Sequence, residues 1–238
     1  MVPFSFAPTF EFCGQELQLV QGRALYWPRE AALLVADLHL EKASYFAGHG
    51  QMLPPYDSRE TLERLALAVR ETGARRVFCL GDNFHDATGS GRLEPHAAGM
   101  LAALTRALDW VWIAGNHDGA EGTGLDELEV GGLLLRHRAL AGELRPEHFG
   151  EHFGEHFGEL SGHFHPRLTV LVRGRRIARP CAVRSERRLI LPAFGALTGG
   201  MDAASPEILS AMQPASTIDA LALAQGRIVE FPLWRAAG

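Results

Sequence analysis

The stretch AALLVADLH at residues 31–39 joins a continuous apolar run to two polar side chains. Consecutive apolar residues of this kind are typical of a strand that is buried on both faces, as in a parallel sheet. The run ends at Asp37, and His39 follows two positions later, so both side chains point the same way if the segment stays extended. Ligand crevices in open α/β sheets lie beyond the carboxyl ends of the strands. The sequence therefore predicts an α/β protein with a polar site at the end of this strand.

Two further apolar runs end in polar clusters in the same way. Residues 77–80 precede Gly81-Asp82-Asn83, and residues 110–114 precede Gly115-Asn116-His117-Asp118. The glycine that opens each cluster allows a tight turn and lets the backbone come close to a ligand. We expect both clusters to face the same crevice as the first one.

Helices are expected between these strands, and a β-rich half is expected after them. Asp57 and Glu60 have the spacing of a capping box, and apolar residues at helical spacing follow as far as Gly73. A second helix is expected over residues 95–108. Strands are expected at residues 133–136, 168–172, 177–183, 189–194 and 228–233, after a starting hairpin within residues 4–27. The predicted fold class is α/β, a two-sheet β-sandwich flanked by helices, in a single domain over residues 1–238.

The bulk composition is that of an ordinary globular protein. Of the 238 residues, 47% are hydrophobic and 21% are charged, which disfavours disorder. No apolar run approaches the roughly 18 residues that span a bilayer, and residues 1–14 do not resemble a signal peptide, so we expect a cytoplasmic protein with no membrane partner. The three cysteines form no C-x-x-C motif, so neither a disulfide framework nor a zinc knuckle is expected.

The charge pattern disfavours nucleic-acid binding by bulk electrostatics but leaves one basic patch. The net charge is −5, whereas proteins that coat nucleic acid are normally basic. Two interpretations of the patch stay open: a hairpin with solvated arginines, or a local contact with nucleic acid. The patch consists of Arg173, Arg175, Arg176, Arg179, Arg184, Arg187 and Arg188.

Two more groups of histidines complete the polar clusters. His137 follows the apolar run 133–135, and Gly162-His163-Phe164-His165 carries two imidazoles at the same i, i+2 spacing as Asp37 and His39. Carboxylates, imidazoles and a neutral amide oxygen together form a ligand set for two divalent cations. The ligand types suit manganese, iron and zinc alike.

The motifs D-x-H, G-D, G-N-H-D, a single H and G-H-x-H, in this order, resemble the calcineurin-like metallophosphoesterase superfamily. The resemblance implies one metal held by four side chains and a second metal that shares Asp82 with the first. It also implies that His117 protonates the leaving oxygen or stabilises its charge, and that Asp118 orients His117. The implied ligands of the first metal are Asp37, His39, Asp82 and His165, and those of the second are Asp82, Asn116, His137 and His163.

The same resemblance implies a reaction. Two metals about 3.5–4 Å apart clamp the phosphate oxygens and lower the pKa of a water between them. A hydroxide that bridges the metals would then attack the phosphorus in line with the leaving group. The expected activity is metal-dependent hydrolysis of phosphodiester bonds.

Residues 36–42, 81–86 and 191–200 extend the resemblance to a narrower branch, the bacterial ligase-associated DNA-damage-response endonucleases. That branch implies a manganese-dependent phosphodiesterase that acts on single-stranded or damaged DNA in DNA repair. It also implies functional association with a DNA ligase, a helicase and an exonuclease. Two alternatives stay open: a phosphodiesterase for cyclic or other small nucleotide diesters, and a metal-stabilised scaffold that binds repair partners without catalysis.

Three positions test how far the resemblance extends. His137 lacks the neighbouring glycine that often accompanies this ligand, and the alternative ligands would be the repeated histidines His148, His152 and His156. The repeat at residues 148–159 is otherwise interpreted as a loop expansion. Residues 192–200 are expected either to form a glycine-rich turn that closes a strand or to border the crevice, where the ring of Phe194 could stack on a base. His85 and Asp86 are expected either to contact the substrate or the metal ligands, or to lie on a surface loop.

Overall fold

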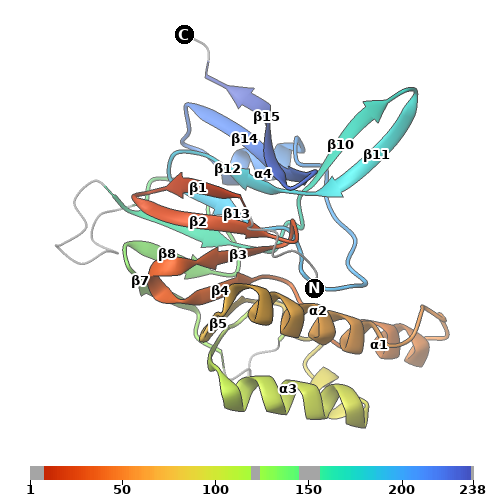
Figure 1. Ribbon diagram of the computed structural model, residues 1–238. Coiled ribbons are helices and arrows are strands. Elements are labelled where there is room, and N and C mark those ends of the chain that lie inside the picture. The colour runs from red at the N-terminus through yellow and green to blue at the C-terminus, as the bar shows by residue number, and fades with distance from the viewer. Residues whose placement is uncertain (1–7, 119–123, 145–155, 237–238) are drawn as a thin grey trace.

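The computed structural model describes residues 8–118, 124–144 and 156–236. Two sheets of six and seven strands pack against each other, and a separate two-stranded ribbon extends beyond them (Figure 1). Helices cover the outer face of the first sheet. The predicted α/β class with two packed sheets is therefore confirmed.

The first sheet combines an antiparallel meander with three parallel strands. Its order is β1-β2-β3-β4-β5-β6, and β4, β5 and β6 run parallel to one another. The apolar run at residues 31–36 forms β4, whose residues are all buried, as expected for a central parallel strand. The bounds are β1 (Thr9–Phe12), β2 (Gln15–Val20), β3 (Ala24–Trp27), β4 (Ala32–Val35), β5 (Arg76–Leu80) and β6 (Asp109–Ile113).

The second sheet has the order β15-β14-β12-β13-β9-β8-β7. Its central strands β8, β9 and β13 are parallel, so their carboxyl ends also meet at one edge. The ribbon pairs β10 (Arg167–Val172) with β11 (Arg175–Pro180). The remaining bounds are β7 (Glu127–Val130), β8 (Leu133–Arg136), β9 (Gly158–Ser161), β12 (Ala182–Arg184), β13 (Arg188–Ile190), β14 (Thr217–Ala224) and β15 (Arg227–Arg235).

The main core lies between the two sheets. Leu25 and Leu34 of the first sheet and Leu160 and Leu189 of the second sheet are fully buried in one cluster. Full burial of a leucine side chain contributes about 1.5–3 kcal/mol. Packing between the sheets therefore fixes the strand ends that carry the polar clusters.

Helices form the outer layer. A second buried cluster joins the outer face of the first sheet to α2 and α3, through Leu62 and Leu65 of α2 and Ala97 of α3. The helices are α1 (Lys42–Gly48), α2 (Asp57–Thr72), α3 (Pro95–Ala107) and α4 (Pro206–Ala211), with 3₁₀ turns at Pro28–Glu30 and Gly89–Arg92. No helix of the described ranges is both long enough and apolar enough to cross a membrane.

The expected capping box of α2 is wrong. Asp57 is the first residue of α2, and the preceding Tyr56 is left-handed and makes no capping hydrogen bond. Oδ2 of Asp57 instead accepts from the backbone N–H groups of Lys42 and Ala43, at 3.0 and 3.2 Å. Asp57 therefore caps the short helix α1, which was not predicted.

The expected strand at residues 177–183 is also wrong as a single element. β11 ends at Pro180 and β12 begins at Ala182, and the two strands belong to different sheets. The buried Cys181 lies at the change of sheet. The chain thus leaves the projecting ribbon and enters the second sheet within two residues.

Candidate metal centre

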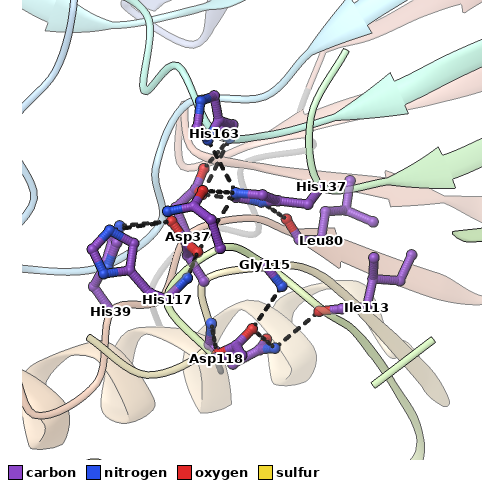
Figure 2. Close-up of polar contacts among 12 residues, drawn as sticks. Asp37, His39, Leu80, Ile113, Gly115, His117, Asp118, His137 and His163 are labelled. Carbon is purple, nitrogen blue, oxygen red and sulfur yellow. Dashed lines mark hydrogen bonds and ion pairs between the residues drawn. The ribbon is translucent and has the colours of Figure 1, made fainter. Parts of the chain in front are cut away.

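The polar clusters converge at the carboxyl ends of five strands (Figure 2). The two packed sheets place these ends at a common edge, which is why clusters from distant parts of the sequence meet there. Asp37 and His39 follow β4, Asp82 follows β5, Asn116 and His117 follow β6, His137 follows β8, and His163 and His165 follow β9.

Left-handed backbone conformation recurs in these clusters. The φ angles of Asp37, His39, Asp82, His163 and His165 lie between 44° and 72°. A residue other than glycine in this region costs on the order of 1–3 kcal/mol, and such strain is concentrated at functional sites. The surrounding packing therefore holds these side chains in place at a cost to stability.

The first group of donor atoms comprises Asp37, His39, Asp82 and His165, which lie within 4.8 Å of one another. Nε2 of His39 is 3.3 Å from Nε2 of His165 and 3.6 Å from Oδ2 of Asp82. Nε2 of His165 is 3.5 Å from Oδ1 of Asp37. These are the four side chains that the resemblance assigned to one metal.

The second group comprises Asp82, His137 and His163, with Asn116 beside them. Nε2 of His137 lies 3.5 Å from Oδ1 of Asp82, 3.1 Å from Nδ1 of His163 and 3.0 Å from Oδ1 of Asn116. The structure thus brings His137 into the group that the resemblance predicted. His148 and His152 lie outside the described residues, while His156 is exposed.

The chemical state of the imidazoles suits cation binding. Nδ1–H of His137 donates to the carbonyl oxygen of Leu80 at 3.1 Å, which leaves Nε2 as the ring nitrogen that faces the other donor atoms. Burial and the neighbouring imidazoles lower the pKa of His39 to about 2, and burial lowers that of His163 to about 4. Both rings are neutral near pH 7, the form that binds metals. The donor set therefore suits divalent cations, and Asp82 has one carboxylate oxygen near each of the two groups.

His117 adjoins both groups through Asp82. Its backbone N–H donates to Oδ1 of Asp82 at 2.9 Å, and its Nε2 lies 3.9 Å from Oδ2. Nδ1–H donates to the carbonyl oxygen of His85 at 2.8 Å, and the two imidazole rings stack with centroids 5.2 Å apart. The ring of His117 is thereby fixed with Nε2 toward the side of the Asp82 carboxylate.

The hydrogen bonds of Asp118 differ from its predicted role in orienting His117. Oδ1 of Asp118 accepts from the backbone N–H groups of Asn83 and Phe84, and Oδ2 accepts from Gly115 N–H and Asn83 Nδ2. Figure 2 shows the contact of this carboxylate with Gly115. Asp118 therefore joins the loops after β5 and β6, while the carbonyl of His85 orients the imidazole.

The expected base-stacking role of Phe194 is wrong, because this side chain is completely buried. The backbone N–H of Phe194 donates to the carbonyl of Ala36 at 2.8 Å, and Gly195 N–H donates to that of Asp37 at 3.2 Å. A β-carbon at Gly195 would overlap the carbonyl oxygen of Leu38. This segment thus packs against the backbone of the loop that carries Asp37 and His39.

A third group of nitrogens adjoins the two metal-binding groups. His39, His85 and His117 lie within 4.8 Å by their ring nitrogens, so His85 faces the centre and is not a separate surface residue. The ring of Phe46 stacks on His85 with centroids 5.5 Å apart. The sequence signal for His85 was its proximity to Asp82 in the chain. The stacking by Phe46 had no such signal, because α1, which supplies Phe46, was not predicted.

Two packed sheets with these donor groups at the strand ends define a metal-dependent phosphoesterase. Residues 32–190 match the family model described as calcineurin-like phosphoesterase. The chain belongs to the calcineurin-like phosphoesterase family. The match covers β4 to β13 and hence every cluster of the centre.

Solved structures add a nuclease to the comparison. The Pseudomonas putida nuclease MPE is similar at 28% identity, with 94% of this chain and 99% of that chain covered and a TM-score of 0.65. A predicted phosphoesterase of Streptococcus pneumoniae (16% identity, 84% and 96% covered, TM-score 0.34) and Vacuolar Protein Sorting 29 of Cryptosporidium parvum (16%, 84% and 95%, 0.32) are less similar. Among curated proteins no match was found.

Proposed function

We propose that this phosphoesterase is a binuclear phosphodiesterase that cleaves DNA. The observation that carries the proposal is the position of Asp82, which offers one carboxylate oxygen to each group of imidazoles. Asp37, His39 and His165 complete one site, and Asn116, His137 and His163 complete the other. Two divalent cations, when bound, supply Lewis-acid activation of the phosphate and of water.

The side chains of the protein position the catalytic acid and protonate the leaving oxygen. His117, with Nδ1–H held by the carbonyl of His85, presents Nε2 as the group that donates a proton to the leaving oxygen. Asp118 contributes indirectly to catalysis, because it holds the loop that carries Asp82 against the loop that carries His117. Stacking of His85 on His117 limits rotation of the acid.

The substrate class and the metal are the finer parts of the proposal. The similarity to a nuclease over nearly the whole chain supports a polynucleotide substrate, and we infer single-stranded or damaged DNA. We infer manganese as the metal, since carboxylate oxygens enter both sites beside the imidazoles and an amide oxygen enters the second, although iron and zinc accept the same ligand types. A role in DNA repair beside a ligase, a helicase and an exonuclease belongs to the same proposal.

A substrate comparison tests the proposed function. The purified protein is incubated with Mn²⁺ and, separately, with bis(p-nitrophenyl) phosphate, p-nitrophenyl phosphate, a single-stranded oligonucleotide and its duplex. We expect cleavage of the generic diester and of single-stranded DNA, and little turnover of the monoester. Hydrolysis of the generic diester with both DNA forms intact would favour a small nucleotide diester as the substrate.

Variants separate chemistry from scaffolding in the same assay. His117→Ala should abolish diester hydrolysis because it removes the proton donor, whereas His96→Ala is a matched control at an exposed position of α3. A wild-type protein that binds Mn²⁺ but hydrolyses none of the four substrates would support a scaffold.

A further inference from the structure

The positive charge of the chain is concentrated in one segment. Residues 166–185 contain six arginines and no acidic residue. Because the whole chain has a net charge of −5, the rest of the chain without these six charges has a net charge of −11. Such separation of charge gives a local potential that the net charge conceals.

Most of these arginines lie on the β10–β11 ribbon. Figure 1 shows the ribbon projecting from the body of the molecule, and neither strand pairs with the two large sheets. Its turn and second strand carry exposed guanidinium groups, and within the described parts of the chain none of them has a carboxylate partner at salt-bridge distance. These four arginines are Arg173, Arg175, Arg176 and Arg179.

The arginines occupy both faces of the ribbon. Side chains alternate along a strand, so Arg175 and Arg179 share one face and Arg176 lies on the other. Arg173 is in the turn that joins the strands, with φ 50°. A surface of this kind suits a flexible polyanion that can pass around the ribbon better than it suits one flat anionic surface.

The base of the ribbon is fixed to the metal centre. β10 begins two residues after His165, and Met201 N–H donates to the carbonyl of His165 at 3.2 Å. Arg167 N–H donates to the carbonyl of Met201 at 2.8 Å, and Ala203 N–H donates to that of Arg167 at 2.9 Å. The ribbon thus leads directly away from one of the candidate ligands.

We propose that the β10–β11 ribbon binds the backbone phosphates of a polynucleotide whose scissile bond lies at the metal centre. This inference rests on the proposed function and adds the surface that distinguishes a polynucleotide from a small diester. From Arg167 to Val172 the ribbon extends about 17 Å, at about 3.3 Å per residue. A strand in duplex geometry has one phosphate per ~3.4 Å and an extended single strand has fewer, so the ribbon reaches at most roughly five phosphates from its base.

The first variant removes the four exposed charges together, as R173Q/R175Q/R176Q/R179Q. A matched control removes four exposed arginines at the opposite edge of the first sheet, where the strands begin, as R29Q/R70Q/R75Q/R106Q. Both variants have the same net charge. A third variant, with lysine at the four ribbon positions, keeps the charge and loses the bidentate geometry of arginine.

Two readouts are compared: hydrolysis of bis(p-nitrophenyl) phosphate with Mn²⁺, and binding of a fluorescent single-stranded 24-mer by anisotropy in EDTA over a range of salt concentrations. In the ribbon glutamine variant we expect diester hydrolysis within about twofold of wild type. We expect its affinity for the oligonucleotide to fall by at least about tenfold. The slope of log affinity against log salt should become shallower by up to about 3, at about 0.7 per phosphate contact. The control and the lysine variant should stay close to wild type.

Other outcomes overturn the inference. Unchanged oligonucleotide affinity in the ribbon variant, with the generic diester still hydrolysed, rejects the ribbon while leaving the proposed phosphodiesterase intact. An equal loss in the opposite-edge control shows a bulk charge effect and overturns the inference. Ribbon-dependent binding to phosphatidylserine vesicles without oligonucleotide binding identifies a membrane surface. If wild type hydrolyses no diester, the proposed function fails. The anisotropy measurement still shows whether the ribbon binds the oligonucleotide.

Discussion

Oδ1 of Asp82 lies 3.5 Å from Nε2 of His137, although the two residues follow strands of different sheets. The other oxygen of the same carboxylate lies 3.6 Å from Nε2 of His39. One carboxylate therefore contacts both donor groups, and each group combines side chains that follow strands of both sheets. Any change that displaces Asp82 should affect both groups at once.

Gly115→Ala should displace Asp82 without removing a ligand. A β-carbon at Gly115 would overlap the backbone nitrogen and Oδ1 of Asp82. Since a displacement of about 1 Å costs roughly a hundredfold in rate, we expect a loss of that order in diester kcat/KM. Gly99→Ala is the matched control, because nothing lies within 4 Å of its β-carbon position in α3. The control should keep full activity and gain about 0.5–1 kcal/mol of stability. Equal activity of the two variants would contradict the close packing of Gly115 on Asp82.

Asp118→Ala should lower the free energy of unfolding. The substitution leaves the N–H groups of Asn83, Phe84 and Gly115 without their acceptor. At about 1 kcal/mol or more for each hydrogen bond, a loss of about 3 kcal/mol is expected in urea denaturation. The loss should be the same in a His117→Ala background. A loss that disappears there would show that Asp118 acts mainly through His117.

Glu159→Gln should change how stability depends on pH. Burial raises the pKa of the Glu159 carboxyl from 4.5 to about 7, despite the nearby Arg136 and Arg188. The unfolded chain releases this proton near pH 4.5 and the folded chain near pH 7, so the carboxyl destabilises the fold increasingly as pH rises between these values. The unfolding free energy of Glu159→Gln, relative to wild type, should rise by up to about 3 kcal/mol across that window. A difference that is constant from pH 4.5 to 8 would contradict the shifted pKa.

Simultaneous replacement of His148, His152 and His156 by alanine should have little effect. In the proposed two-metal centre the described donor groups supply all the ligands without the repeat. Bound manganese and diester turnover should therefore stay at the wild-type level. A large fall in metal content would show that the repeat supplies ligands.

The strands and clusters of the centre were predictable because their pattern is local. A continuous apolar run followed closely by a ligand type indicates a strand and the position of its carboxyl end, as at Asp37, Asp82 and Asn116, although the strand before Asn116 is only partly buried. Once several such units belong to two packed sheets, their ends have to meet. The order of the motifs predicted His137 as a ligand, although it lacks the neighbouring glycine that often accompanies this ligand.

The roles of Asp57, Asp118 and Phe194 were not predictable, because their partners are distant in sequence. Asp57 contacts the first residues of α1, and Asp118 contacts loop residues 34 and 35 positions away. Phe194 is buried because its segment pairs with the loop after β4. Local patterns favour Asp57 as a cap of its own helix, Asp118 as a partner of the adjacent His117 and Phe194 as an exposed ring. In each case tertiary contacts override the local pattern.

Metal content and turnover of Asp82→Asn test the binuclear centre most directly. The metal-free wild type and the variant are titrated with Mn²⁺, bound metal is quantified after removal of free metal, and hydrolysis of bis(p-nitrophenyl) phosphate is measured on the same samples. Wild type should bind two Mn²⁺ per chain and hydrolyse the diester. The variant should bind less metal and lose hydrolysis, with an unchanged circular dichroism spectrum. Full activity of Asp82→Asn, or a single Mn²⁺ in active wild type, would contradict a two-metal site built on Asp82.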